Sequence, residues 1–226
     1  MSGIELRSRA ELRNLVVVWD LRAYGLSRWY PWYAFRFPTL RYQRVLRRTE
    51  RWMGEPYLHA HLMYLYWRLR LRHLGIRMGL SIPPGVFGPG LSIPHYGSIV
   101  VNDKVRAGAF CRIHSATNIG ENGGSAPVIG DGVYLAPGSV VYGAANIGSR
   151  SVVAANSVVG VSAPSGSLIA GVPAKVRFCD PGVYDRAMPS WIVEALDSYA
   201  ESALWLTDLW LRRKSVEADH TPTRTQ

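Results

Sequence analysis

The chain has 226 residues, 48% of them hydrophobic and 19% charged, so it can form a sizeable core and is not a disordered chain. Its two isolated cysteines, Cys111 and Cys179, exclude a disulfide framework and a cysteine-rich metal site, and they suit a reducing compartment. Residues 1–13 are polar and no apolar run could span a bilayer, so we expect a cytoplasmic protein. The net charge of +10 lies entirely within residues 1–79, which contain 15 Arg and 5 acidic residues.

Residues 1–79 are expected to form an Arg-rich helical region. Apolar residues recur there at helical spacing, as at Leu58, Leu62, Leu65 and Leu69, and predict two or three amphipathic helices. Breaks are expected near Pro31, Pro38 and residues 54–56. No nucleic-acid-reading motif accompanies the charge, so we expect no nucleic-acid partner. We expect this region to pack against other subunits or to lie on an anionic membrane at its cytoplasmic face.

Residues 80–178 carry a strict six-residue repeat. Aliphatic residues follow one another every six positions at Ile129, Leu135, Val141, Ile147, Val153 and Val159, and upstream at Val101, Ala107, Ile113 and Ile119. A helix has a period of 3.6 and a half-buried strand a period of 2, so neither explains this spacing. It indicates a triangular coil of short parallel strands, in which one aliphatic residue per hexad points inward.

The repeat is interrupted twice, and insertions in a solenoid become loops on its surface. The phase shifts by two between Ile99 and Val101, close to His95. Ile129 then follows Ile119 by ten positions instead of six. The four extra residues lie in a glycine-rich stretch, residues 121–126. Glycine there allows backbone N–H groups to approach a ligand.

Residues 179–226 are expected to form a C-terminal helix followed by a polar tail. A single stripe is predicted along that helix, formed by Trp191, Ala195, Ser198, Ser202, Trp205 and Leu209.

Three segments in this order resemble the serine acetyltransferase branch of the hexapeptide-repeat acyltransferases. They are the block Ser92-Ile93-Pro94-His95-Tyr96-Gly97, the loop Asn118-Ile119-Gly120-Glu121-Asn122-Gly123-Gly124 and the closing motif Ala170-Gly171-Val172-Pro173-Ala174-Lys175. The resemblance covers residues 80–178 well and the N-terminal region only in kind. It implies a left-handed parallel β-helix, acetyl-CoA as co-substrate, no metal, and a homotrimer with active sites between subunits. The N-terminal helices could double that trimer to a hexamer.

The acetyl transfer that the resemblance implies needs a general base. His95, in the block that resembles the family's catalytic segment, is the candidate, because neutral imidazole can accept a hydroxyl proton near pH 7. His114 follows the inward-pointing Ile113, so it should point outward and could share the same cleft in a catalytic or acceptor-binding role. No nucleophilic Ser or Cys motif is visible, so direct transfer without an acyl-enzyme is expected. Ser81, Asp103 or a backbone carbonyl is a candidate to orient His95.

The resemblance also implies where CoA binds. Gly120, Asn122 and Gly123 would contact it at the loop, Pro137 and Ala155 would leave room for the pantetheine arm, and Lys175 would meet its phosphates. Ala155 is also compatible with simple packing of the coils.

Departures from the family pattern bear on the acceptor. Pro94 stands where the serine enzymes have Asp, Ser81 aligns with a second family Asp, and Ser125-Ala126-Pro127 replaces an Arg-His pair. The sequence therefore favours a hydroxyl of a sugar or polysaccharide precursor as acceptor and predicts poor use of free serine, with Tyr96 as an aromatic platform. Serine O-acetylation and a non-catalytic hexapeptide-repeat scaffold are the alternatives. A metal-dependent hydratase on this fold would need three histidine ligands, and the repeat contains only two histidines.

Overall fold

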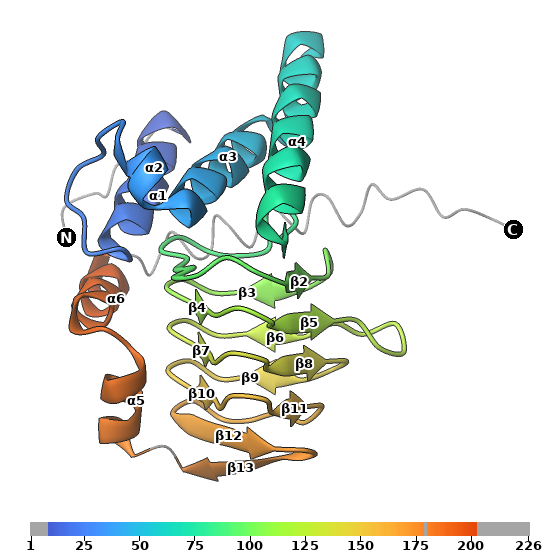
Figure 1. Cartoon of the computed structure of the whole chain (residues 1–226), viewed down its shortest axis with the longest axis vertical. Coiled ribbons are helices and arrows are strands. Elements are labelled where there is room, and N and C mark those ends of the chain that lie inside the picture. Colours follow the sequence, from blue (N-terminus) through green and yellow to red (C-terminus); the bar gives the residue numbers. More distant parts are fainter. Residues whose placement is uncertain (1–8, 179, 203–226) are drawn as a thin grey trace, which may run out of the picture.

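The computed structural model describes residues 9–178 and 180–202, and it contains a parallel β-helix with helices at one end and along one side (Figure 1). Four helices precede the β-helix: α1 (Arg9–Arg22), α2 (Tyr33–Arg36), α3 (Pro38–Trp52) and α4 (Leu58–Met78). The sequence predicted two or three helices in this region, and the structure has three long helices and the single-turn α2. Pro38 is the first residue of α3, where its missing N–H costs no hydrogen bond, and Gly79 ends α4 with φ of 68°.

Short strands form the three sides of the coil. The first sheet contains β1 (Leu80–Ser81), β2 (Ile99–Val101), β5 (Asn118–Gly120), β8 (Val140–Tyr142) and β11 (Val158–Val159). The second contains β3 (Arg106–Ala107), β6 (Val128–Ile129) and β9 (Asn146–Ile147). The third contains β4 (Arg112–Ile113), β7 (Tyr134–Leu135), β10 (Val152–Val153), β12 (Ser167–Gly171) and β13 (Ala174–Phe178). Every pairing is parallel except that of β12 with β13, which closes the solenoid as an antiparallel hairpin.

The register explains the six-residue period. Val101 pairs with Ile119 in the next coil, so 18 residues, or three hexads, complete one coil. All ten predicted inward residues are at most 3% exposed and stack in the core. Each buried aliphatic side chain contributes about 1.5–3 kcal/mol to folding. This ladder therefore contributes substantially to the stability of the solenoid.

The second interruption of the repeat forms a loop, as expected. Ile119 pairs with Val141, 22 residues later, because four residues have been added to that coil. The loop projects from the solenoid after β5 (Figure 1). Asn122 and Ser125 pair across its turn, and Gly123 and Gly124 have φ of 60° and 80°. A side chain at either glycine would meet no atom within 4 Å, so the positive φ and not crowding favours glycine there.

A buried polar network attaches the N-terminal helices to the first coil. Arg47 of α3 bonds Asp20 of α1 at 2.8 Å and Glu50 at 2.9 Å, and it also donates to the carbonyls of Phe87 and Gly88. Burial opposes the charge of Arg47, but the two carboxylates raise its pKa above the ordinary value. Removing one partner of such a pair leaves an uncompensated buried charge, so the network fixes how the helices sit on the solenoid.

Two further helices, α5 (Pro181–Ala187) and α6 (Ser190–Ser202), run along one side of the solenoid (Figure 1). The predicted stripe on α6 is displaced in the structure. Ile192, Ala195, Leu196 and Tyr199 are buried, whereas Trp191 is 48% exposed and Ser198 faces solvent. Tyr199 packs edge-on against Trp19 and Phe110, and this contact rotates the helix away from the expected stripe. Trp205 and Leu209 lie outside the described residues.

The apolar stripe predicted on α4 faces away from the body of the molecule. Ala60, Leu71 and Leu74 are buried, whereas four leucines and one isoleucine are 46–77% exposed: Leu58, Leu62, Leu65, Leu69 and Ile76. Among the described residues, no helix is long and apolar enough to cross a membrane.

Candidate functional site

His95 lies in the turn that joins the third side of the first coil to β2. Ser92 precedes it and pairs with Arg112 of β4, and Ile99 of β2 follows it. Ile93 and Ile99 are fully buried, so the hexad phase leaves His95 and Tyr96 on the surface between them. The imidazole is therefore solvent-accessible at an edge of the solenoid, as a general base requires.

Tyr24, in the turn after α1, fixes the backbone next to His95. Its hydroxyl donates to the carbonyl of Ile93 at 3.1 Å and accepts from the N–H of the same residue at 3.3 Å. Burial raises the pKa of Tyr24 to about 12, so the hydroxyl keeps its proton and both bonds persist. The N-terminal helices thus position the segment that carries His95.

His114 occupies the equivalent turn one coil later and lies beside His95. The centroids of the two rings are 5.8 Å apart. Burial, the Arg112 charge and His95 lower the pKa of His114 to about 4, so this ring is neutral at physiological pH. Its Nε2 is buried and has no hydrogen-bond partner among the described residues.

Two further residues complete the cluster and were not singled out from the sequence. Tyr134 of β7 packs edge-on against His114, with ring centroids 5.2 Å apart. Arg112 of β4 pairs with Tyr134 in register and donates from Nη1 to Ser92 Oγ at 3.0 Å. The six-residue phase could have identified both residues. Each immediately precedes an inward aliphatic residue, and the two are separated by the one coil that contains the four-residue insertion.

No described residue holds the ring of His95 by a hydrogen bond. Ser81 pairs through its backbone with Val100, and the Asp103 carbonyl accepts from Arg106. No contact among the described residues supports the role proposed for Ser81 or Asp103 in orienting His95.

Three of the predicted CoA-binding residues follow the same edge of the solenoid as His95. The register Ile113↔Leu135↔Val153 places Ser115, Pro137 and Ala155 at the position of His95 in successive coils, and Pro137 and Ala155 are exposed. Lys175 pairs with Ala170 at the end of the same edge. Since neighbouring strands lie about 4.8 Å apart, this line of small residues runs roughly 20 Å from His95 to Lys175.

The loop residues Gly120, Asn122 and Gly123 lie elsewhere in the chain. Gly120 is the last residue of β5 and the other two follow it, at the end of the strand remote from the His114 turn. Glu121 at the base of the loop pairs with Lys104 at 2.8 Å. Within one chain the structure does not bring them to the line that starts at His95.

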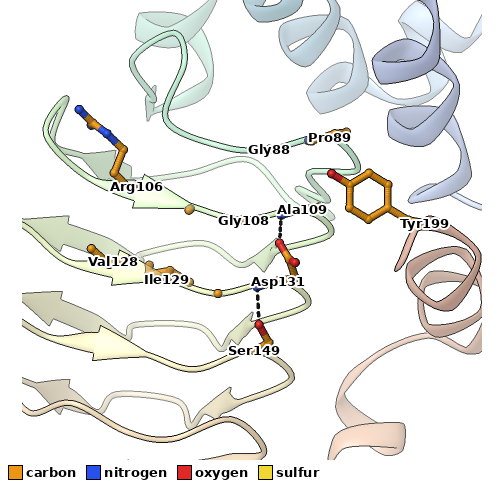
Figure 2. Close-up of a pocket in the computed structure, with 12 residues that line it drawn as sticks. Gly88, Pro89, Arg106, Gly108, Ala109, Val128, Ile129, Asp131, Ser149 and Tyr199 are labelled. Carbon is orange, nitrogen blue, oxygen red and sulfur yellow. Dashed lines mark hydrogen bonds between the residues drawn. The ribbon is translucent and has the colours of Figure 1, made fainter. Parts of the chain in front are cut away.

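A hollow of about 220 Å³ lies on another side of the solenoid, between the second sheet and α6 (Figure 2). Its lining includes Gly108, Asp131, Ser149 and Tyr199. The Asp131 carboxylate accepts from the N–H of Ala109 at 2.6 Å, and burial raises its pKa. This hydrogen bond joins adjacent coils and is structural. Because neither His95 nor His114 lines the hollow, we do not assign the reaction to it.

The described residues include no cluster of three or more His, Cys, Asp or Glu side chains arranged as metal ligands. Cys111 is fully buried, and burial raises the pKa of its thiol to about 12, which disfavours the nucleophilic thiolate.

The sequence is similar to those of known serine acetyltransferases. Residues 126–160 match the family model for the bacterial transferase hexapeptide (six repeats). The chain is 30% identical over 132 residues to the serine acetyltransferase of Mycobacterium tuberculosis (strain ATCC 25618 / H37Rv), covering 54% of this chain and 58% of the relative. It is 35% identical over 103 residues to that of Staphylococcus xylosus, covering 43% and 48%. The chain thus spans about half the length of these curated relatives.

Solved structures share the fold. The soybean serine acetyltransferase apoenzyme superimposes with a TM-score of 0.61 at 23% identity, covering 74% of this chain and 69% of the other. The Neisseria gonorrhoeae serine acetyltransferase in complex with serine gives 0.60 at 25% identity, covering 75% and 70%. The six-residue repeat and the parallel β-helix of this chain are thus similar to those of hexapeptide-repeat serine acetyltransferases.

Proposed function

We propose that this protein is an acetyl-CoA-dependent O-acetyltransferase with His95 as its general base. The observation that carries the proposal is the exposed His95 at the head of a line of small residues that ends at Lys175, on a fold shared with serine acetyltransferases. One of the similar structures is a serine acetyltransferase in complex with CoA. The line is the path that the pantetheine arm takes in our proposal.

The reaction proceeds by direct transfer. His95 accepts the proton of the acceptor hydroxyl while the oxygen attacks the thioester carbonyl, and the resulting tetrahedral intermediate expels the CoA thiolate. The imidazolium then returns its proton to the thiolate, so the products are the O-acetyl ester and CoA. The low pKa of His114 keeps that ring neutral, so it does not repel the positive charge that forms on His95, whose ring is 5.8 Å away.

L-Serine is the acceptor that the comparisons favour. The relatives and solved structures described above are all serine acetyltransferases, and none of them supports the sugar acceptor that the sequence indicated. The sugar hydroxyl is kept as the second candidate on one observation: the ring of Tyr96, 64% exposed beside His95, offers a platform on which a sugar could stack.

An acceptor panel separates the two candidates. Release of CoA and the mass of the product are measured with acetyl-CoA and L-serine, nucleotide sugars or short glycans. We expect O-acetylserine and the highest kcat/KM with L-serine. A nucleotide sugar or glycan with a kcat/KM above that of L-serine would replace serine as the acceptor, and the absence of transfer to every acceptor would overturn the enzyme assignment and favour a scaffold.

We further propose a homotrimer in the cytoplasm. The loop residues Gly120, Asn122 and Gly123 lie apart from the His95 edge in one chain, and a neighbouring subunit would bring them to it. Doubling to a hexamer and peripheral contact with an anionic membrane both involve the N-terminal helices, and they compete for the exposed face of α4.

A further inference from the structure

Arg112 carries a half-buried positive charge, and no acidic side chain of the described residues pairs with it. Its one side-chain hydrogen bond among the described residues is the 3.0 Å contact with Ser92 Oγ, and its Nε is buried and unpartnered. The side-chain ion pairs of the described region involve Arg47, Lys104 and Arg150 instead. An arginine removed from water is stabilised by an oxyanion that it can bind through two parallel N–H groups, so Arg112 is suited to a ligand of that chemistry.

The groups around Arg112 are neutral. Burial raises the pKa of Tyr134 and of Tyr24, so both phenols keep their protons, and burial together with Arg112 and His95 keeps His114 uncharged. Desolvation lowers the pKa of Arg112, and these neutral phenols compensate little of that cost. An anion would therefore meet one positive group in surroundings that do not screen it strongly.

The position of Arg112 connects it to the reaction. It lies on β4 two residues before His114, whose ring is 5.8 Å from that of His95, and it bonds Ser92, three residues before His95. The ring of His114 thus lies between the proposed base, His95, and the guanidinium of Arg112. Its Nε2 is buried and has no hydrogen-bond partner among the described residues. A small acceptor bound at His95 would present its other polar groups to this cluster.

We propose that Arg112 binds the anionic group of the acceptor, the carboxylate of L-serine, and that the neutral His114 forms a hydrogen bond with its ammonium group. This inference rests on the proposed acetyl transfer and assigns the recognition of a zwitterion to residues of the third sheet. It provides the cation that the sequence lacks where Ser125-Ala126-Pro127 replaces an Arg-His pair.

The test compares Arg112→Gln and Arg112→Lys with wild type, using L-serine and L-serinamide as acceptors. Arg106→Gln is the matched control, because Arg106 also precedes an inward residue, in β3, but donates only to nearby backbone carbonyls. We expect Arg112→Gln to raise the KM for L-serine on the order of 10- to 100-fold, with kcat changed less than about threefold. Its preference for serine over serinamide should vanish, Arg112→Lys should retain part of it, and Arg106→Gln should behave as wild type.

A phosphate is the other oxyanion that Arg112 could bind, and acetyl-CoA carries phosphates. If Arg112→Gln raises the KM for acetyl-CoA but not for acetyl-dephospho-CoA, while the KM for serine is unchanged, the ligand is the CoA phosphate and the proposal is overturned. An unchanged preference for serine over serinamide in Arg112→Gln overturns it as well.

Failure of this inference can be told from failure of the proposed function. Calorimetric titration of the protein with L-serine, without acetyl-CoA, reads out binding independently of turnover. Binding by wild type and His95→Ala but not by Arg112→Gln supports the subsite even if no acetyl transfer is found. Absence of serine binding to folded wild type overturns it, even where another acceptor is acetylated.

Discussion

Two histidines of the same edge differ in what their surroundings allow. His95 is exposed and carries no hydrogen bond among the described residues, so its ring is accessible to an acceptor hydroxyl. His114 is held neutral by burial, Arg112 and His95, and it can only donate or accept a hydrogen bond near pH 7. This difference underlies our proposal that His95 is the general base and that His114 takes part in recognition of the acceptor.

Replacing His95 by Ala should lower kcat by at least about 10²-fold, the scale of general base catalysis, while CoA binding is retained. Steady-state turnover and CoA titration calorimetry measure the two quantities. His61→Ala is the matched control, because that histidine is exposed on α4 away from the site. Near-normal turnover in a folded His95→Ala protein contradicts the assignment.

The low pKa of His114 predicts how stability depends on pH. Its pKa is about 4 in the folded chain and 6.5 in the reference state, so the unfolded chain binds a proton near pH 5 that the folded chain does not. The stabilisation is complete above about pH 6.5 and is lost as the pH falls toward 4. We expect Tm to fall less between pH 7 and pH 4.5 in His114→Gln than in wild type.

His61→Gln provides the comparison for that measurement, since it removes an exposed histidine from α4. Equal losses of Tm in wild type, His114→Gln and His61→Gln would mean that His114 titrates normally in the folded protein.

The sequence revealed part of this site. The hexad phase predicted that His114 points outward and made it a candidate for the same cleft as His95, and the centroids of the two rings lie 5.8 Å apart. Arg112 was overlooked because a lone arginine before a core residue is usually a solvated side chain. Its meaning depends on the contact with Ser92, which lies 20 residues earlier and becomes a neighbour only through the register.

At the scale of the elements, the solenoid depends on one inward residue per hexad. Leu135 of β7 is fully buried and pairs in register between Ile113 and Val153. Leu135→Ala should lower the free energy of unfolding by about 2–5 kcal/mol, because the stacked coils cannot close the cavity. Val128→Ala is the control: Val128 precedes an inward residue in β6 and is 48% exposed, so a loss below about 0.5 kcal/mol is expected.

Chemical denaturation of both variants measures these losses. Equal effects of Leu135→Ala and Val128→Ala would show that the inward ladder does not dominate the stability of the solenoid.

The strands were easier to predict than the helices for a physical reason. The hexad repeats in the sequence, and all ten inward residues that it identified are buried. An isolated helix shows only its apolar stripe, which does not reveal what covers it. On α6 the contacts of Tyr199 with Trp19 and Phe110 rotate the buried face, and on α4 the apolar stripe faces outward.

At the scale of the whole molecule, charge and exposed apolar surface coincide at the N-terminal end. Helix α4 contains four arginines and three histidines and no acidic residue, and it projects from the solenoid (Figure 1). Its exposed leucines lie between these basic residues. Two such helices would repel each other when paired, whereas an anionic lipid surface accepts both the leucines and the arginines.

We therefore predict salt-sensitive binding to vesicles that contain anionic lipid. Each basic residue near such a surface contributes about 1 kcal/mol, and physiological salt screens this attraction beyond about 8 Å. Sedimentation with vesicles at low and high salt measures the binding. Leu62→Ser combined with Leu69→Ser should abolish it by removing exposed apolar area, and Val100→Ser, which alters an exposed side chain of β2, should not. Two results together would instead assign the exposed face of α4 to contact between copies of this chain. They are the absence of vesicle binding at low salt and a smaller oligomer for the double variant by light scattering.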